Sequence, residues 1–267
     1  MDYLHAVENR KNTLIKLLNR IDFYESEITE ALYKDFKKPA FEAFVTEINI
    51  VREDLKHTIK NVKSWAKPKR VLPSLLNFPS SDYIYSEPYG KVLIISPWNY
   101  PFQLALSPVI AAFAAGNQVT LKPSELTPNT SSLLSKIIRE TFDVKEVVAV
   151  LGDAELSKNL LTKKWDYIFF TGSVGVGKKV YEAAAQHLTP VTLELGGKNP
   201  CIVDDTGSMA LKAKRIVWGK FINAGQTCIA PDFILVKSNV KEEFIKHLIT
   251  EIKKAYTENP HLSPDYC

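Results

Sequence analysis

Residues 167–177 read YIFFTGSVGVG, and this stretch decides the fold. Residues 167–170 form a short apolar run typical of a buried strand, and the glycines that follow indicate a tight turn into a helix. Glycine lets a phosphate group approach the backbone closely, and a helix N-terminus favours its negative charge. The spacing G-x-x-G-x-G differs from the usual dinucleotide fingerprint G-x-G-x-x-G. The stretch therefore fits either a phosphate-binding turn or a plain tight turn with Ser173 as the helix N-cap.

The same alternation of strand and helix extends outward from this stretch in both directions. Short apolar runs predict strands, and periodic apolar positions between them predict helices. Strands that alternate with helices favour a parallel sheet covered on both faces. We therefore predict an α/β fold, a Rossmann-like parallel sheet with flanking helices. The strands are expected at residues 91–96, 118–121, 147–151, 167–170 and 191–195, and the helices at 104–115, from Thr127-Pro128 onward, at 154–161 and at 175–185.

The two ends of the chain follow other patterns. Residues 1–66 are helical in pattern, with a break at Lys37-Lys38-Pro39. Residues 71–88 look like an extended excursion, as a strand or hairpin would. After residue 197 a further segment begins, with strands expected near 202–203 and 233–236 and helices at 210–221 and 240–256.

The amino-acid composition limits the classes of protein to which the chain can belong. The chain has 267 residues, 45% hydrophobic and 24% charged, with a net charge of +4, so it is an ordinary globular chain with no strong electrostatic partner such as nucleic acid. The three cysteines, Cys201, Cys228 and Cys267, are widely spaced, which argues against a disulfide framework and against a structural metal site. A signal peptide and an apolar run of membrane-spanning length are both missing from the sequence pattern. We therefore expect a cytoplasmic protein.

Three other places carry residues suited to chemistry. Residues 223–228 (NAGQTC) surround Cys228 with polar and glycine residues, which suits an exposed nucleophile, although a lone cysteine is also a common small core residue. Glu194 stands at a strand end before two glycines and fits a general base or a surface carboxylate. Residues 96–102 (SPWNYPF) follow a strand where α/β sheets bind ligands, and Asn99 could donate an N–H there. A rigid aromatic turn explains the same residues.

Five motifs, taken in their order along the chain, make the functional interpretation more specific. WNYPF at 98–102, KPSE at 122–125, FTGS at 170–173, ELGGK at 194–198 and GQTC at 225–228 together resemble the aldehyde dehydrogenase superfamily. GKF at 219–221 with GQTCIAPD at 225–232 resembles its class 3, or fatty and aromatic aldehyde, branch. The resemblance covers essentially the whole chain.

The resemblance implies NAD(P)-dependent oxidation of an aldehyde to a carboxylic acid. It makes Cys228 the nucleophile, which would form a thiohemiacetal and then a thioester. It makes Asn99 the oxyanion donor, together with the backbone N–H of Cys228. Glu194 would be the general base that activates water.

The resemblance also implies a set of cofactor-binding residues. Lys122 and Glu125 would hold the adenine ribose, and the Glu125 carboxylate would repel a 2′-phosphate, which favours NAD while leaving NADP possible. The other implied residues are Pro97, Trp98, Ser124, Gly172, Ser173, Gly175, Gly177, Leu195 and Gly196.

Domain organisation follows from the same resemblance. It implies an NAD-binding domain over residues 1–197, with bridging strands for homodimerisation inserted at 71–89. Residues 198–267 would begin a catalytic domain that continues far beyond Cys267, so the chain is expected to be incomplete. Apolar residues at Ile234, Leu235 and Ile245 should then lack covering partners.

Two other functions stay open. An acyl-thioester or acyl-phosphate reductase would run related thioester chemistry backwards, although it has no need of a water-activating Glu194. A truncated, catalytically inactive NAD-binding or interaction module would bind cofactor without turnover.

Overall fold

The computed structural model describes residues 3–267, and its centre is a five-stranded parallel sheet in the order β5-β4-β3-β6-β7. The chain builds β3, β4 and β5 outward in one direction and then returns to the other side of β3 for β6 and β7. The strand order therefore reverses between β3 and β6, which is where open α/β sheets bind ligands. The strands are β3 (Lys91–Ile95), β4 (Gln118–Lys122), β5 (Val147–Ala149), β6 (Tyr167–Gly172) and β7 (Val191–Leu195).

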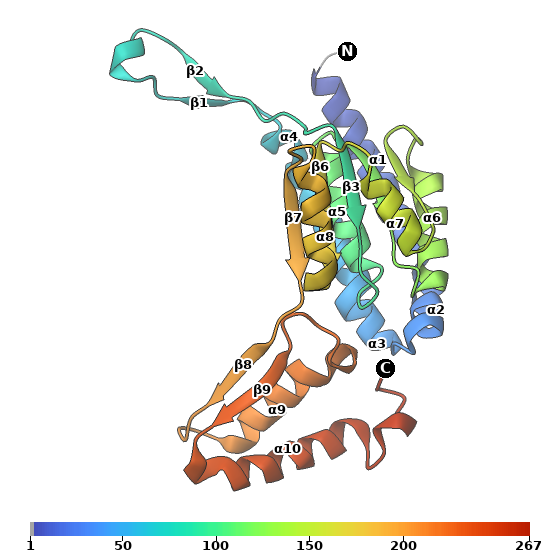
Figure 1. The fold of residues 1–267 in the computed structure, drawn as a ribbon, viewed down its shortest axis with the longest axis vertical. Coiled ribbons are helices and arrows are strands. Elements are labelled where there is room, and N and C mark those ends of the chain that lie inside the picture. The colour runs from blue at the N-terminus through green and yellow to red at the C-terminus, as the bar shows by residue number, and fades with distance from the viewer. Residues whose placement is uncertain (1–2) are drawn as a thin grey trace.

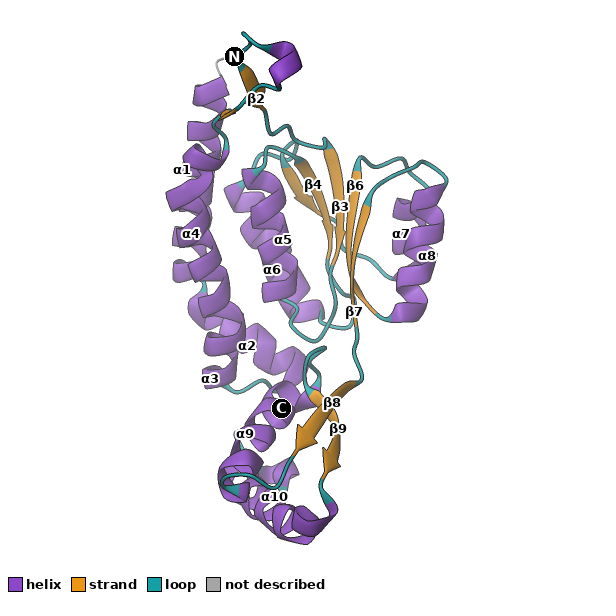
Figure 2. Ribbon diagram, turned by 90° about the vertical axis from the view of Figure 1, so that its left-hand side faces the viewer, coloured by secondary structure: helices purple, strands orange, loops and turns teal. Residues whose placement is uncertain are grey.

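Helices cover both faces of this sheet (Figure 2). Side chains of β3 alternate, so Val92 and Ile94 enter one core while Leu93 and Ile95 enter the other. The first core lies under α1 (Tyr3–Phe23), α4 (Asn49–Trp65), α5 (Gln103–Ala114) and α6 (Pro128–Thr141); the second lies under α7 (Ala154–Leu161) and α8 (Val174–Ala185). The predicted parallel sheet with flanking helices is confirmed.

Short elements connect α1 to α4. Helix α2 (Glu25–Phe36) ends at Lys37, whose φ of 51° is left-handed, and α3 (Ala40–Ala43) follows. A π-helical turn, η1 (Phe44–Ile48), then leads into α4. The break predicted at Lys37-Lys38-Pro39 is therefore confirmed.

Two local expectations need correction. Strand β5 ends at Ala149 rather than at Leu151, because the chain turns away after the Val150 N–H donates to Leu121 O (2.8 Å). Helix α6 does begin after Thr127, but the Thr127 side chain does not cap it. The Asp35 carboxylate accepts the N–H groups of Asn129 (3.1 Å) and Thr130 (2.7 Å) instead.

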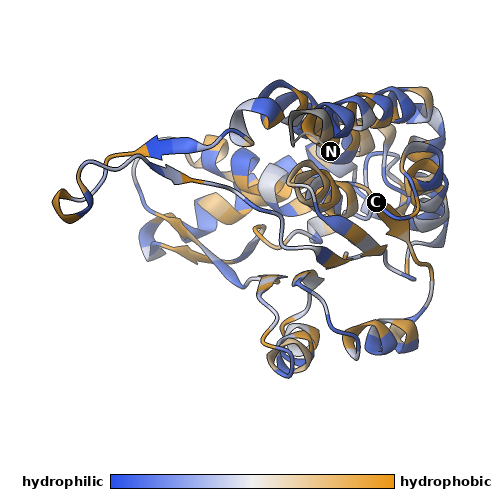
Figure 3. Ribbon diagram, turned by 90° about the horizontal axis from the view of Figure 1, so that it is seen from above, coloured by the Kyte–Doolittle hydropathy of each residue, from blue (hydrophilic) through white to orange (hydrophobic). Residues whose placement is uncertain are grey.

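A hairpin projects from the body of the molecule (Figure 1). Strand β1 (Lys69–Val71) pairs antiparallel with β2 (Asp82–Ile84), and a 3₁₀ turn, η2 (Leu75–Asn77), lies between them. Leu72, Leu75 and Leu76 are 95%, 97% and 96% exposed. Figure 3 shows apolar residues at the tip, away from the core. The expected extended excursion is therefore a hairpin with an unburied apolar tip.

The last part of the chain forms a smaller layer beside the large sheet (Figure 1). Strands β8 (Asn199–Val203) and β9 (Pro231–Val236) are parallel, and α9 (Met209–Phe221) and α10 (Lys241–Tyr256) pack on one face of the pair. The 3₁₀ turns are η3 (Ile222–Gly225), η4 (Ser238–Val240) and η5 (Pro260–Leu262).

The outer face of this layer is apolar and open, as expected in part. Leu235 is exposed and Ile245 lies at the edge of exposure, but the expectation for Ile234 is wrong. Ile234 packs inward because strand residues alternate, and Ile202 and Phe233 share the exposed face with Leu235. The division into domains at residue 197 stays a prediction. None of the helices described over residues 3–267 is long and apolar enough to cross a membrane.

Candidate active site

The carboxyl edge of the sheet brings the separate motifs together. The Ser96 N–H donates to Lys122 O (3.1 Å), which joins the end of β3 to the end of β4. On the other side of the reversal point, Thr171 pairs with Glu194 and Gly172 pairs with Leu195. The segments that begin at Ser96, Lys122, Thr171 and Glu194 therefore share one edge.

The glycine turn is open where a phosphate would bind. Ser173 is the N-cap of α8, and its Oγ accepts the Val176 N–H (3.3 Å). A Cβ at Gly177 would lie 2.8 Å from Leu195 Cδ2, so a larger residue there would require the Leu195 side chain to move. A Cβ at Gly175 would meet no atom of residues 3–267 within 4 Å. Ser173 therefore caps this turn, and its phosphate-binding role stays a prediction.

An ion pair stands at the end of β4. Lys122 is almost fully buried and pairs with Glu125, whose side chain is 40% exposed. Burial alone would raise the pKa of Glu125, but the hydrogen bond and charge of Lys122 hold it below its ordinary value. The Ser124 side chain is buried in the turn, where its Oγ accepts the Leu126 N–H (3.2 Å). Glu125 thus presents a carboxylate to solvent, while Ser124 shapes the loop.

The loop before Cys228 has an unusual backbone. Asn223, Ala224 and Gly225 have φ values of 56°, 48° and 75°. Left-handed backbone at a non-glycine residue costs on the order of 1–3 kcal/mol and persists only where the surroundings fix it. Cys228 follows as an exposed free thiol. The surrounding residues therefore fix this loop in the conformation that presents Cys228 at the surface.

Two side chains of the WNYPF motif fix this loop. Asn99 Nδ2 donates to Gln226 O (2.7 Å), and the Tyr100 hydroxyl lies 2.5 Å from Thr227 Oγ1. Burial raises the pKa of Tyr100 to about 12, although its hydrogen bond to Thr227 acts in the opposite direction, so the phenol stays protonated at neutral pH. The amide of Asn99 is thereby held within two residues of Cys228.

The segment that follows β7, the strand that carries Glu194, contacts the same loop. Asn199 Nδ2 donates to Cys228 O (2.7 Å) and to Ala230 O (3.1 Å). A Cβ at Gly197 would lie 2.7 Å from Cys228 O. The Glu194 side chain is exposed three residues before this contact. The site thus combines an exposed thiol, an amide donor and a carboxylate on neighbouring segments.

The remaining predicted residues lie beside this arrangement. Trp98 is on the loop after β3 and its ring centroid lies 5.7 Å from that of Phe36. Pro97 is half-buried next to it, and Gly196 is exposed after β7. Each predicted position therefore falls at the carboxyl edge of the sheet or on the loops that extend from it.

Sequence patterns missed a buried set behind the site. Lys38 and Glu47 form an ion pair whose side chains are both 0% exposed. Glu42 Oε2 accepts the Asn223 N–H (2.9 Å), and burial raises the pKa of this carboxyl. One signal was available, because Glu47 lies three residues after Phe44 and four before Val51, on an otherwise apolar helical stripe.

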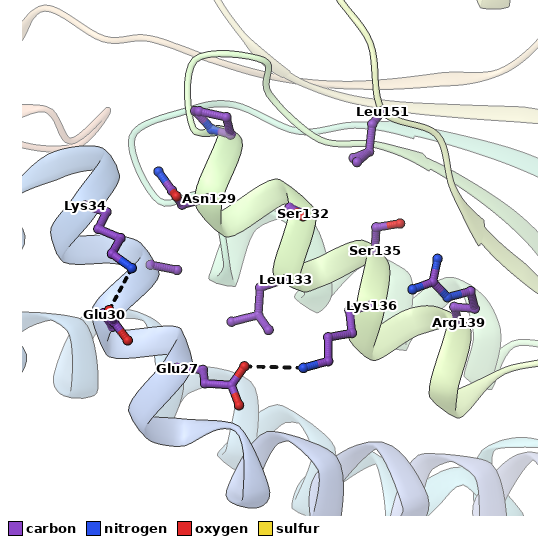
Figure 4. A pocket seen from close by; sticks show the side chains of 12 residues that line it. Glu27, Glu30, Lys34, Asn129, Ser132, Leu133, Ser135, Lys136, Arg139 and Leu151 are labelled. Carbon is purple, nitrogen blue, oxygen red and sulfur yellow. Dashed lines mark hydrogen bonds and ion pairs between the residues drawn. The ribbon is translucent and has the colours of Figure 1, made fainter.

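An open groove of 570 Å³ lies elsewhere, between α2 and α6 (Figure 4). Four of its charged side chains form two ion pairs, with Lys34 2.7 Å from Glu30 and Lys136 3.4 Å from Glu27. It contains none of the predicted site residues. Hollow surface alone therefore does not mark the candidate site.

Comparison with known proteins matches nearly the whole chain. The sequence model of the aldehyde dehydrogenase family matches residues 4–266. The 4,4′-diaponeurosporen-aldehyde dehydrogenase of Staphylococcus aureus is 49% identical over 257 residues, which is 96% of this chain and 56% of that protein. Aldehyde dehydrogenase family 3 member B1 of Mus musculus is 45% identical over 241 residues, 90% of this chain and 52% of that protein.

A solved structure of Staphylococcus aureus AldH in its substrate-bound state superposes with a TM-score of 0.95 at 48% identity. The match covers 97% of this chain and 57% of that one. The chain therefore spans a little over half the length of the relatives it matches.

Proposed function

The chain belongs to the aldehyde dehydrogenase family, and on that premise we propose that it is the cofactor-binding part and the start of the catalytic part of an enzyme that oxidises an aldehyde to a carboxylic acid. The observation that carries the proposal is the pair of hydrogen bonds from Asn99 and Tyr100 to the loop of Cys228. They hold an amide donor beside an exposed thiol, which is the arrangement that attack on a carbonyl carbon requires.

Each residue has a defined task in the proposed reaction. The Cys228 thiolate forms a bond from Sγ to the aldehyde carbon, and the carbonyl oxygen becomes an oxyanion. The second N–H of Asn99 Nδ2 and the backbone N–H of Cys228 donate to that oxyanion. One such donor lowers the barrier by about 3 kcal/mol in comparable sites.

The second half of the reaction releases the acid. After the carbon has lost a hydride, a thioester remains on Cys228. Glu194 takes a proton from water, whose oxygen attacks the thioester carbon and breaks the C–S bond. Aldehyde, oxidised cofactor and water thus become carboxylate, reduced cofactor and two protons.

A nicotinamide dinucleotide, when bound, supplies the hydride acceptor. The residues present fit such a group, because the first turn of α8 is open at Gly175 and can accept a pyrophosphate. Lys122 and Glu125 would hold the adenine ribose at the end of β4. Because Glu125 is ionised and exposed, we infer a preference for NAD over NADP, since a 2′-phosphate would meet a like charge.

Assembly and location complete the proposal. We infer a homodimer that buries the hairpin of residues 71–89, because Leu72, Leu75 and Leu76 are almost fully exposed at its tip. We place the protein in the cytoplasm on the basis of its free cysteines.

The test uses the complete native polypeptide with an aldehyde and NAD. Cys228→Ala should abolish aldehyde oxidation and leave NAD affinity unchanged. Cys201→Ala is the matched control, because Cys201 packs against the core of the β8–β9 layer and should keep activity. Glu194→Gln should give one burst of reduced cofactor and then stall.

The outcomes separate the competing functions. Activity in Cys228→Ala would refute the nucleophile, and a missing burst in Glu194→Gln would refute the water-activating role. Reduction of an acyl-thioester with NADPH, faster than aldehyde oxidation, would identify a reductase. Cofactor binding without either reaction would identify an inactive binding module.

A further inference from the structure

A charged pair lies completely buried behind the candidate site. Lys38 stands in the break between α2 and α3, and Glu47 lies in the π-helical turn η1. Their side chains are both 0% exposed and form a direct ion pair. Burying two charges costs several kcal/mol per ion before their attraction repays it, and apolar residues of similar size often serve stability better. A role other than stability is therefore worth seeking.

The hydrogen bonds of this pair point to one segment. Glu47 Oε2 accepts the N–H of Phe102 (2.8 Å) and of Gln103 (3.1 Å), which fixes the start of α5. Lys38 Nζ donates to Asn99 O (3.3 Å) and lies 4.5 Å from the ring centroid of Tyr100. Among the described residues, every hydrogen bond that the two side chains make outside the pair goes to residues 99–103. The pair thus fixes both ends of the loop that carries Asn99 through hydrogen bonds.

The same loop is tied to the cysteine loop through Asn223. This side chain is completely buried, and its Nδ2 donates to Asn99 O (2.8 Å) and to Gln226 O (3.3 Å). Asn99 O therefore accepts from both Lys38 and Asn223, while Asn99 Nδ2 donates to Gln226 O. A shift of the Asn99 backbone would therefore also displace the loop that presents Cys228.

We propose that Lys38 and Glu47 are positioning residues that hold the Asn99 amide in register with Cys228. This rests on the proposed function, because Asn99 has a catalytic task only if Cys228 attacks a carbonyl group. The pair itself touches neither substrate nor cofactor. It acts by fixing the backbone on either side of the amide.

The test is a double-mutant cycle in the complete native polypeptide. Lys38→Met combined with Glu47→Gln removes both charges together and leaves no unpaired ion in the core. Asn99→Ala is made alone and in that background, and kcat and KM for aldehyde are measured with the dissociation constant for NAD. Arg52→Met is the control, since the largely buried Arg52 side chain on α4 pairs with Asp22 and Glu25 and, among the described residues, makes no hydrogen bond to either loop.

The test is whether the effects of the paired substitution and of Asn99→Ala on kcat are additive. Asn99→Ala alone should lower kcat about a hundredfold. The paired substitution should lower kcat about tenfold or more with unchanged NAD affinity, and Asn99→Ala in that background should then lower kcat by only about a further tenfold or less, so that the combined loss does not exceed that of Asn99→Ala alone. Arg52→Met should leave kcat unchanged and should still show the full loss on adding Asn99→Ala.

Two failures are distinguishable. Fully additive effects of the pair and Asn99 would overturn the positioning role and leave the proposed function intact. No effect of Asn99→Ala alone would instead remove the amide from the proposed reaction, and the positioning role with it. If the paired variant does not fold, Glu47→Gln alone keeps the shape of the side chain and enters the same cycle with the same two outcomes.

Discussion

Replacing Gly197 by alanine should separate the cysteine loop from the strand that carries Glu194. The added Cβ would lie 2.7 Å from Cys228 O, whereas ordinary contact begins near 3.4 Å, so a gap of about 0.7 Å must open. The other near atoms belong to Asn199, at 2.9 Å and 3.0 Å. Asn199 cannot easily give way, because its Nδ2 bonds both Cys228 O and Ala230 O. The strain should therefore appear as a displacement of Cys228.

The magnitude follows from the displacement. A misplacement of about 1 Å in a reacting group can cost about a hundredfold in rate, so 0.7 Å should lower kcat roughly ten- to hundredfold. That corresponds to about 1.4–2.7 kcal/mol of barrier. NAD affinity should change less than kcat, because Lys122 at the end of β4 and Gly175 in the first turn of α8 lie on other segments. The assay is steady-state aldehyde oxidation by the native polypeptide, with cofactor binding measured separately.

Gly219→Ala supplies the control for this change. Its Cβ would lie 3.8 Å from Pro231, which is ordinary contact, and a glycine inside α9 favours the helix less than alanine. The control should keep activity and gain up to about 1 kcal/mol in the free energy of unfolding. If Gly197→Ala kept its kcat within about twofold of the wild type, the inferred close approach would be without functional meaning.

Two further predictions concern cofactor choice and assembly. Glu125→Gln should improve NADP use relative to NAD about fivefold, since one like charge near 4 Å is worth about 1 kcal/mol in water; Glu155→Gln, in a similar exposed pair with Lys158, should not. Because the folded-state pKa of Glu125 is lowered, its carboxylate contributes stability above the ordinary carboxyl pKa, and this contribution disappears as pH falls. The free energies of unfolding of the wild type and of Glu125→Gln should therefore converge in acid. Leu75→Lys should convert the proposed dimer to a monomer in light scattering, whereas Leu188→Lys, at a leucine that is 91% exposed elsewhere, should leave the mass unchanged. A dimer that survived Leu75→Lys would place the interface away from the hairpin tip.

Local patterns were enough for most of the sheet and its helices. Runs such as residues 91–95 are apolar and β-branched, and the glycine turn after β6 marks the start of α8. These signals lie within a few residues of the structure they specify. The positions of Asn99, Glu194 and Cys228 at strand and helix ends could likewise be predicted from motif order. The parallel sheet places the segments of Asn99 and Glu194 at one edge, whereas the Cys228 loop is held there by hydrogen bonds from Asn99, Tyr100 and Asn199.

Contacts between distant residues could not be predicted in this way. Asp35 caps α6 from 94 residues away, and Asn223 bonds Asn99 across 124 residues. For the pair of Lys38 and Glu47, the sequence offered only the place of Glu47 on an apolar helical stripe, and nothing in it indicated that Lys38 is its partner. Such contacts depend on how finished elements pack, and a single sequence carries little local trace of packing.

The loop that presents Cys228 is held through its main-chain oxygens. Asn99 and Asn223 bond Gln226 O, and Asn199 bonds the oxygens of Cys228 and Ala230. The side chains of Gln226 and Ile229 are exposed and take no part in these bonds. Exchange at these two positions would leave the scaffold around the thiol in place. The conformation of the loop thus depends on three asparagine side chains and its own main chain rather than on the side chains next to the thiol, so these neighbours can be varied in the laboratory to change the surface around Cys228 without changing its position.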